Sequence, residues 1–588
     1  MAFYLSNPKN FSGTDVSLLI QCHRICHSAG TKNLFDSLNL TINQGDRIGL
    51  VGHNGSGKST LLSIINGTLE ADNGDLSRSR SLQLETVEQF IDPSLIDLSL
   101  SDALANKFTE EQQESNYFKV EQLLNELGFT STESQYRVGD LSGGQQNRLM
   151  FARAVISEPN LILFDEPTNH LDLRTLLFFE SFLNNLNASY LIISHDRQFL
   201  DAVTDRTIFL RDQRVYNFNL PYGQAKDKLD EEDKMAEARL REEEKVIKDL
   251  TVSAKRLAQW GKVYDNEKIA RKAKNMEKRI VKLEEKKTFV TKGSNLNLSL
   301  EVQTSRVNRM LHVENKDIFS PGENPKKLFS IGEFYIRPGD RIALLGNNGT
   351  GKTTFIKKIM DHYQDDLRTD IFSFNPQCDI GYYDQEIEDL DPTHTLVDVL
   401  RQNCLQGSES DYKSALIKAG FPFLDMDKKV AVLSGGEKAR LMFLVIKLNK
   451  PNFLILDEPT NHIDIQGKEE LEDQILESRA TVLITSHDRR FVDNIAQRYA
   501  LIDGGSLIEI NEPNYFYEQN EQSSTTTGKQ KQQKIEEEML TTDDEILGRI
   551  LELETVLFED LQRKPKFQKP KLQQQWQEEL EKLNESIS

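Results

Sequence analysis

The feature that most constrains this chain is a set of motifs that occurs twice in the same order. The glycine-rich stretch GHNGSGKST at 52–60 returns as GNNGTGKTT at 346–354. LSGGQQNRLMFARAVISEPNLILFDEPTNHLD (141–172) returns as LSGGEKARLMFLVIKLNKPNFLILDEPTNHID (433–464), and SHDRQFLD returns as SHDRRFVD. The members of each pair are separated by about 290 residues, which predicts a duplicated domain. A chain of 588 residues has room for both copies and for further segments.

Each copy predicts an α/β fold around a phosphate-binding loop. RIGLVG and RIALLG read as strands before the two glycine loops, and the residues after each loop read as a helix. The apolar runs LILF, FLIL, YLIIS and TVLIT are typical of buried parallel strands that helices cover. In such folds the ligand chemistry occurs at the carboxyl ends of the strands.

The two glycine loops predict nucleotide binding. Glycines let successive backbone N–H groups wrap phosphate oxygens at the positive end of the following helix. Lys58 and Lys352 are predicted to reach the β and γ phosphates, and Ser59 and Thr353 to place a hydroxyl on Mg²⁺. The predicted ATP-binding residues of the loops are Gly52, Asn54, Gly55, Gly57, Lys58, Ser59, Thr60, Gly346, Asn348, Gly349, Gly351, Lys352, Thr353 and Thr354.

Paired acids and a histidine supply the predicted catalytic groups. Asp165 and Asp457 end a strand and suit Mg²⁺ coordination, and the next residues, Glu166 and Glu458, are placed to orient or deprotonate the attacking water. A histidine in each SHD motif can donate to the γ-phosphate, and a glutamine in VEQF or YYDQE can contact Mg²⁺ or the water. These catalytic candidates are His195, His487, Gln89 and Gln385, and the glutamines join Ser59, Thr353, Asp165 and Asp457 as magnesium candidates.

LSGG predicts a second anion cradle in each copy. A hydroxyl and close-approaching amides at the start of a helix bind phosphate, yet each copy already has its own phosphate loop. The second cradle therefore needs a different phosphate. We expect the two copies to meet head to tail, each completing the nucleotide site of the other. The cradle residues are Ser142, Gly143, Gly144, Ser434, Gly435 and Gly436.

Together these motifs resemble the Walker A, Q-loop, signature, Walker B, D-loop and switch-histidine motifs of the ATP-binding cassette superfamily. DEPTNHLD and DEPTNHID in tandem cassettes resemble its ABC-F group. The resemblance covers most of residues 14–520. It implies two tandem P-loop cassettes that hydrolyse ATP with Mg²⁺, in a protein that binds the ribosome at the tRNA exit site in the ATP-closed state and regulates translation. Where cassettes usually stack an aromatic ring on adenine, the first copy offers only His27 and the second Phe319.

The resemblance divides the chain into five segments. They are a first cassette (14–224), a helical inter-cassette linker (225–292), a second cassette (293–520), a flexible linker (521–533) and a C-terminal coiled-coil hairpin (534–588). Both cassettes keep every catalytic residue type, so we expect both sites to hydrolyse ATP.

The inter-cassette linker carries a local basic face that the net charge of −21 hides. Two apolar stripes at helical spacing flank QWGKVYDNE, which predicts an antiparallel helical hairpin. Between Lys255 and Lys287 there are twelve lysines or arginines against five acids. By the family resemblance this face contacts tRNA and rRNA phosphates, although it could also be a solvated linker. The candidates are Lys255, Arg256, Lys262, Arg271, Lys272, Lys274, Lys278 and Arg279.

Several readings of the partner stay open. No apolar run approaches the roughly 18 residues needed to span a bilayer, and the N-terminus lacks the build of a signal peptide. We therefore expect a cytoplasmic, monomeric protein with an intramolecular cassette dimer. The alternatives to a translation factor are a ribosome-protecting antibiotic-resistance factor, disfavoured by the short turn in the linker, and a DNA-associated ATPase that uses the C-terminal hairpin on branched or repair intermediates. The ATPase subunit of a membrane transporter is the least favoured reading.

Overall fold

The structure is a computed structural model. It describes residues 17–30, 32–87, 91–127, 129, 133–141, 143–169, 171–263, 271–272, 274–280, 309–322, 324–364, 372–384, 390–404, 407–461, 463–478, 480–517 and 520.

The first copy contains two sheets. A three-stranded antiparallel sheet has the order β2-β1-β4, and a six-stranded sheet has the order β5-β6-β7-β3-β8-β9. All neighbours in the larger sheet are parallel except β8 and β9. The strands are β1 (Leu18–Ala29), β2 (Lys32–Asn43), β3 (Arg47–Val51), β4 (Asn73–Arg78), β5 (Leu84–Val87), β6 (Leu161–Asp165), β7 (Ser189–Ile193), β8 (Arg206–Arg211) and β9 (Arg214–Phe218).

The second copy repeats this arrangement strand for strand. Its sheet of nine has the order β13-β10-β11-β18-β17-β12-β16-β15-β14. The antiparallel and parallel parts join through one pairing, Ser330 with Ser506. The strands are β10 (Leu311–Phe319), β11 (Lys327–Ile336), β12 (Arg341–Leu345), β13 (Phe372–Phe374), β14 (Ile380–Tyr383), β15 (Phe453–Asp457), β16 (Thr481–Thr485), β17 (Arg498–Asp503) and β18 (Ser506–Ile510).

Helices follow the strands in the same order in both copies. Those of the first copy are α1 (Lys58–Asn66), η1 (Pro93–Leu95), α2 (Leu100–Ala105), α3 (Glu110–Glu126), η2 (Glu133–Gln135), η3 (Val138–Asp140), α4 (Gly143–Val155), α5 (Leu173–Asn185) and α6 (Arg197–Val203). Those of the second copy are α9 (Lys352–Gln364), α10 (Leu396–Asn403), α11 (Glu409–Lys418), η4 (Phe423–Asp425), η5 (Val430–Val432), α12 (Gly435–Asn449), α13 (Ile465–Ser478) and α14 (Arg489–Ile495).

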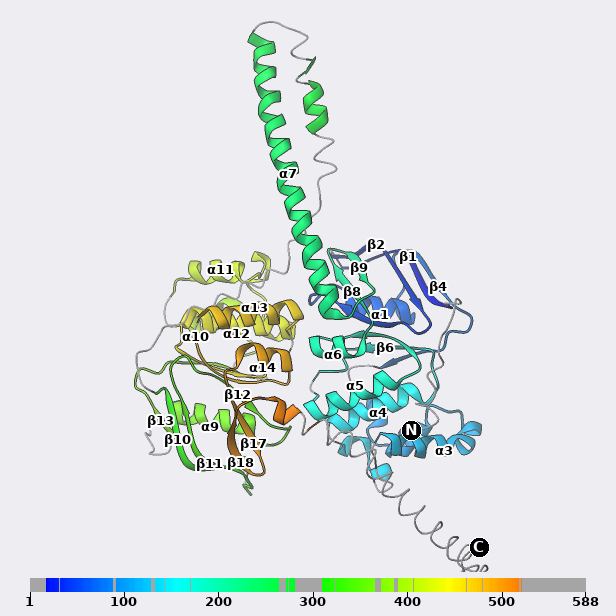
Figure 1. The fold of residues 1–588 in the computed structure, drawn as a ribbon, viewed down its shortest axis with the longest axis vertical. Helices are drawn as coiled ribbons and strands as arrows, with labels where there is room; N and C mark the ends of the chain where they lie inside the picture. The colour runs from blue at the N-terminus through cyan, green and yellow to red at the C-terminus, as the bar shows by residue number, and fades with distance from the viewer. Residues whose placement is uncertain are drawn as a thin grey trace, which may run out of the picture.

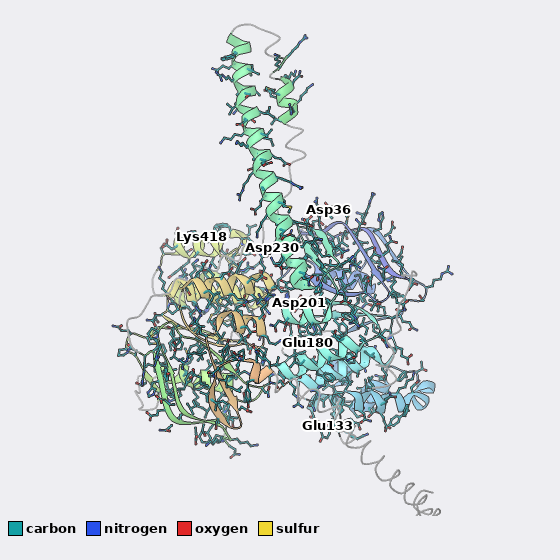
Figure 2. All side chains as sticks on the ribbon, viewed as in Figure 1. Asp36, Glu133, Glu180, Asp201, Asp230 and Lys418 are labelled. Carbon is teal, nitrogen blue, oxygen red and sulfur yellow. The ribbon has the colours of Figure 1, made fainter. Side chains whose placement is uncertain are left out.

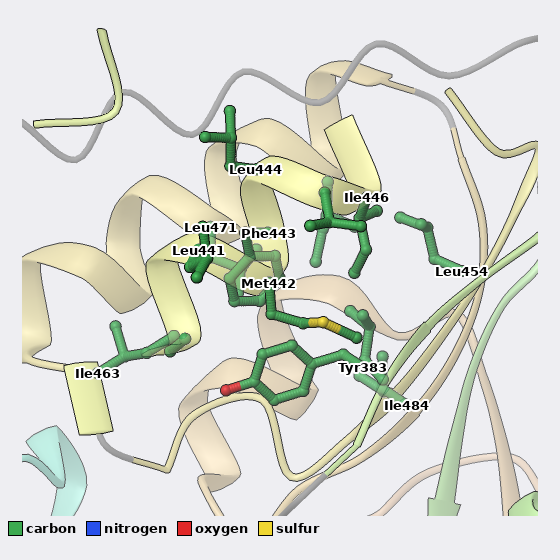
Figure 3. Close-up of a cluster of buried hydrophobic side chains, with 14 of the residues drawn as sticks. Tyr383, Leu441, Met442, Phe443, Leu444, Ile446, Leu454, Ile463, Leu471 and Ile484 are labelled. Atoms are coloured by element: carbon green, nitrogen blue, oxygen red, sulfur yellow. The ribbon is translucent and has the colours of Figure 1, made fainter. Parts of the chain in front are cut away.

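Each copy has a hydrophobic core on both faces of its parallel strands. In the second copy the core between the sheet and helix α12 includes Tyr383, whose ring stacks on Phe443 with centroids 4.8 Å apart (Figure 3). In the first copy Phe151 of α4 stacks on Phe179 of α5 at 3.8 Å. Close packing of this kind fixes the strand ends, and therefore fixes the loops that leave them.

The two copies lie side by side, with α5 and α6 of the first facing α13 and α14 of the second (Figure 1). Their cores meet at this boundary. Leu173 and Leu177 of α5 belong to a core of the second copy, and Ile465 of α13 belongs to a core of the first. Glu180, labelled in Figure 2, lies on the side of the first copy that faces the second.

The predicted linker begins with one long helix, α7 (Tyr222–Val263), which projects away from both copies (Figure 1). On this helix Ile247, Leu250 and Leu257, which belong to the first predicted apolar stripe, are partly buried, and Ala254 of the same stripe is buried. Residues 271–272 and 274–280 are helical as well. The burial of this stripe is what a helical hairpin requires.

Within the described part of the chain, every helix is too short or too polar to cross a membrane. The predicted segments at 521–533 and 534–588 lie outside the described residues, as do residues 264–267 of the predicted turn QWGKVYDNE. The first part of that turn, 259–263, is instead the end of helix α7, so the helix runs further than the sequence predicted.

Candidate functional site

The two glycine loops adopt a conformation that their sequence dictates. Gly57 and Gly351, which precede α1 and α9, have φ of 99° and 103°. This left-handed region is strained for other residues. A Cβ on Gly57 would also lie 2.8 Å from the Phe35 ring. The loops therefore wrap close to the sheet and direct backbone N–H groups inward at a helix N-terminus, which is a cradle for phosphate.

The predicted lysines lie in these cradles. The ammonium of Lys58 donates to the carbonyl of Gly52 at 2.8 Å, and that of Lys352 donates to the carbonyl of Gly346 at 2.7 Å. Burial lowers the pKa of both lysines, against the opposing charges of the nearby glutamates Glu166 and Glu458. Each lysine thus holds its loop in shape and keeps a positive charge inside the site.

The acids that end β6 and β15 meet the hydroxyls of the loops. Asp165 is hydrogen-bonded to Ser59, and Asp457 to Thr353 and to Thr485. Burial raises the pKa of Asp457 to about 6, despite the bond from Thr485. Within the described residues, Oδ2 of Asp457 is buried without a hydrogen-bond partner. A buried carboxylate oxygen of this kind suits a hard cation or its bound water.

The glutamates that follow these acids have a left-handed backbone conformation that the sequence does not predict. Glu166 and Glu458 have φ of 50° and 49°, a sparsely populated region for residues other than glycine that is often found at active sites. Both backbone amides bond to the neighbouring strand: Glu166 N donates to Ile193 O, and Glu458 N to Thr485 O, each at 3.1 Å. The same bend therefore presents both carboxylates to the site.

The histidine of each SHD motif faces its glutamate. His195 Nε2 lies 3.1 Å from Glu166, and His487 Nε2 lies 3.5 Å from Glu458 and 3.0 Å from Oδ1 of Asn348. Burial raises the pKa of Glu166, but the bond and charge of His195 and the charge of Lys58 outweigh it and bring the value to about 2. Burial lowers the pKa of both histidines. The arrangement holds an ionised carboxylate beside an imidazole, as an acid–base pair requires.

Both copies line one continuous cavity of about 1000 Å³. His53, Asn54 and Gly55 come from the first loop, and Gly349, Gly351, Lys352, Thr353 and Thr354 come from the second. The second LSGG motif contributes Ser434, Gly435 and Gly436 to the same cavity. Ser434 caps α12, where its hydroxyl accepts from Glu437 N at 3.3 Å. Residues of both predicted sites therefore meet in one cavity between the copies, although Lys58, Ser59, Asp165, Gly143 and Gly144 do not line it.

An aspartate that follows each DEPTNH motif was missing from the predicted site. Oδ2 of Asp464 accepts from Asn54 N at 2.8 Å across the boundary, while Oδ1 accepts from Gly467 N at 2.9 Å and caps α13. Asp172, its counterpart, places its charge beside Lys352 and His487 of the opposite copy. The sequence signal for this aspartate is its recurrence at the end of both motifs. Its role cannot be derived from that signal, because the groups it contacts belong to the other copy.

Two reciprocal ion pairs close the boundary. Arg197 of α6 pairs with Glu472 of α13, and Arg489 of α14 pairs with Glu180 of α5. These four residues occupy equivalent positions of the duplicated sequence. The first pair is the more buried, with side chains 1% and 7% exposed against 12% and 13% for the second. An approximate twofold relation between the copies accounts for both pairs.

Other predicted residues lie apart from the cavity or outside the described residues. Gln89, Gln385 and Ser142 are outside them. Gly143 is exposed at the start of α4. His27 pairs with Asp72 at 3.4 Å, and Phe319 is exposed next to Ser320 and Pro321, which line the cavity. The described basic candidates of the linker are exposed, and the Arg256 guanidinium lies 4.8 Å from the centre of the Trp260 ring. The side chain of Lys262 is not described.

Two phosphate cradles, each with a lysine, a strand-end acid pair and a histidine, define a class of protein with tandem nucleotide-binding cassettes. The family model described as ABC transporter matches residues 35–169 and 329–461. ABC transporter F family member 5 of Arabidopsis thaliana is 31% identical over 526 residues, which are 82% of this chain and 74% of that protein. ATP-binding protein Uup of Buchnera aphidicola is 30% identical over 482 residues, which are 80% and 78% of the two chains.

The chain belongs to the ABC-F family, and the tandem-cassette α/β fold predicted from the sequence is confirmed. Two solved structures share this fold at 19% identity. One is the archaeal ribosome recycling factor aABCE1 in complex with the ribosomal stalk protein aP1, with a TM-score of 0.56 and coverage of 84% of this chain and 92% of that chain. The other, RNase-L Inhibitor, has a TM-score of 0.55 and coverage of 85% and 93%.

Proposed function

We propose that this protein is an ATPase that binds the ribosome while its cassettes are closed on two ATP molecules, regulates translation there, and is released by hydrolysis. The observation that carries the ATPase is the composite cavity: both cassettes contribute loop residues, strand-end acids and histidines to one space between them. Such a space is complete only when the cassettes are together, so bound nucleotide favours the closed state.

The residues present fit ATP and Mg²⁺. The left-handed glycines open the loops to phosphate, and the buried oxygen of Asp457 without a protein partner suits a cation. Lys58 and Lys352 hold phosphate oxygens in this proposal, and Ser59, Thr353, Asp165 and Asp457 hold Mg²⁺, which neutralises phosphate charge when bound. Glu166 and Glu458 orient the attacking water, and His195 and His487 face the γ-phosphate.

The first turns of the linker helix α7 form ion pairs with both cassettes. These contacts support a coupling between the nucleotide state of the cassettes and the position of the linker. Arg211 of β8 holds Asp233 of α7 through two bonds of 2.6 Å. Lys226 of α7 lies 3.8 Å from Glu469 of α13 in the second cassette. Opening the cassettes separates these anchors, so the exposed basic end of the linker moves relative to one of them.

The ribosome as partner is supported by the family and by the basic linker. A solved structure with the same fold is a ribosome recycling factor, and the linker residues Lys255, Arg256, Lys272, Lys274 and Arg279 are exposed, where they can contact tRNA or rRNA phosphates. Phosphate contacts position a protein without reading sequence. In this proposal the protein acts as a monomer in the cytoplasm.

Co-sedimentation tests the proposal. The Glu166→Gln/Glu458→Gln protein is mixed with ribosomes and resolved on a sucrose gradient with ATP, with ADP and without nucleotide. We expect it in the ribosomal fractions with ATP alone, because removing the carboxylates traps the closed form. If the protein is absent from these fractions and is retained on branched DNA, its partner is DNA and not the ribosome.

A second variant separates the linker from the cassettes. Neutralising Lys272, Lys274, Lys278 and Arg279 with glutamine is expected to weaken ribosome association most at low salt and to make it less dependent on salt, because each lost phosphate contact removes counterion release. Basal ATPase activity is expected to persist, since the four residues lie on the projecting linker (Figure 1). Equal loss of both activities would assign the linker a structural role.

A further inference from the structure

Lys468 makes a contact across the boundary between the cassettes that the duplicated sequence does not repeat. It lies on α13 of the second cassette and is only 5% exposed. Its ammonium donates to the backbone carbonyl of His195 in the first cassette at 2.9 Å, and to Oδ2 of Asp488 in its own cassette, also at 2.9 Å. A buried ammonium is costly unless its donors are used, so the carbonyl of His195 is part of what keeps Lys468 at this place.

The equivalent position of the first cassette is Leu176, three residues after the start of α5. The neighbouring features are kept in both copies, including the aspartates Asp172 and Asp464 and the reciprocal arginine–glutamate pairs. Leucine has no donor, so the relation between Lys468 and His195 has no counterpart that Leu176 could make with His487. The fold of a cassette thus does not require a lysine here.

The contact is made on the backbone of His195, whose side chain is part of a predicted catalytic pair. The His195 ring is 3.1 Å from Glu166, and its backbone carbonyl is the group that Lys468 holds. Because the lysine comes from the opposite cassette, this hold exists only while the cassettes are closed. The position of the His195 ring therefore depends on closure of the two cassettes, through the bond from Lys468. His487 in the second site has no equivalent bond, because the equivalent residue is Leu176.

We propose that Lys468 is a positioning residue for the nucleotide site of Lys58 and Glu166: it fixes His195 when the cassettes close, so that turnover at this site depends on a residue of the second cassette that the other site does without. The inference rests on the proposed ATPase function and adds an asymmetry between the two sites. Fixing a group that acts in the transition state affects turnover more than substrate affinity.

Two backgrounds separate the sites. Glu458→Gln leaves only the Glu166 site active, and Glu166→Gln leaves only the other. Lys468→Leu, which introduces the residue that the first cassette itself carries, is added to each. In the Glu458→Gln background we expect kcat for ATP to fall about tenfold with an unchanged KM, equivalent to about 1.4 kcal/mol. In the Glu166→Gln background Lys468 contacts Asp488 but not the backbone of His487, so kcat is expected to stay within about twofold.

Two further variants control for folding and charge. Lys468→Arg keeps a donor and is expected to restore part of the lost kcat. Lys418→Leu removes a charge from the exposed end of α11 in the same cassette (Figure 2) and is expected to change neither background. Thermal unfolding of each variant shows whether the cassettes remain folded.

The outcomes distinguish this inference from the proposed function. If the Glu458→Gln parent hydrolyses no ATP, the Glu166 site is not an independent catalytic site, and both the ATPase assignment and the role of Lys468 fail there. If the parent is active and Lys468→Leu slows both backgrounds equally, slows only the other site, or slows neither, the role of Lys468 alone is overturned. A loss confined to the Glu166 site with partial rescue by arginine supports it.

Discussion

The two proposed nucleotide sites share their candidate catalytic residues and differ in the residues that support them. Both glutamates have the same left-handed backbone, with φ of 50° and 49°, and both lysines hold a loop carbonyl at nearly the same distance. Behind the acids, however, Thr485 donates to Asp457 at 2.5 Å, whereas the equivalent residue of the first cassette is Ile193. The residues proposed to face the nucleotide are retained in both copies, whereas a residue packed behind them differs.

The aspartates of the two SHD motifs, Asp196 and Asp488, show a consequence of this divergence. Burial raises the pKa of Asp488, but the charges of Lys468 and Arg197 outweigh it and lower the pKa overall. Asp196, whose cassette has Leu176 in place of that lysine, has a pKa raised by burial and by the charge of Asp488. Equal reactive groups therefore sit in unequal electrostatic surroundings, and we expect the two sites to turn over at different rates.

The largest expected effect tests what the sites share. Changing Glu166 and Glu458 together to glutamine is expected to lower steady-state phosphate release by about 100-fold or more, because a general base contributes about 10²–10⁴. The single variants are expected to leave unequal residual rates. Near wild-type turnover in the double variant would mean that other groups activate the water.

The reciprocal ion pairs give the next effect. Arg197→Met leaves the buried Glu472 without its charged partner, keeping only the bond from the Asn494 amide at 2.8 Å, which is expected to cost about 3 kcal/mol. Arg489→Met is expected to cost less, because its pair is more exposed. The unfolding temperature in the presence of ATP measures the difference, and Arg197→Met/Glu472→Leu is the matched control that should recover most of the loss. Equal losses for the two arginines would show that the pairs are equivalent.

Asp464 gives a smaller effect that is specific to one site. Asp464→Ala removes the acceptor of Asn54 N and the cap of α13, and a hydrogen bond to a charged group contributes about 1.5–3 kcal/mol. In the Glu458→Gln background turnover is expected to fall roughly tenfold or more. An unchanged rate would assign Asp464 to the helix cap alone.

The smallest effect exchanges the supporting residues. Thr485→Val removes the hydroxyl that donates to the buried Asp457, at a cost of about 1 kcal/mol, so we expect a fall of several-fold in turnover in the Glu166→Gln background. Ile193→Thr makes the reverse change in the first cassette. If neither substitution changed the turnover rate, the difference between Thr485 and Ile193 would not affect function.

Sequence alone predicted the parts of the sites that are local and repeated. A glycine loop before a helix and an acid pair after an apolar strand are set by neighbouring residues, so the predicted cassettes were found with their strands in matching order. The left-handed backbone of Glu166 could not be predicted, because it depends on a bond to β7. Asp464, Glu472 and Lys468 acquire their partners only when two distant surfaces meet, and Lys468 has no repeat to draw attention to it.

A crossed set of variants tests whether each nucleotide site is completed by the opposite cassette. Ser434→Arg, in the second cassette, is combined with Glu458→Gln or with Glu166→Gln, and Ser142→Arg, in the first, is combined with the same two. Hydrolysis is measured for all four proteins. We expect Ser434→Arg to abolish turnover at the Glu166 site and Ser142→Arg to abolish turnover at the Glu458 site. Loss that instead follows the cassette carrying the substituted serine would contradict the account.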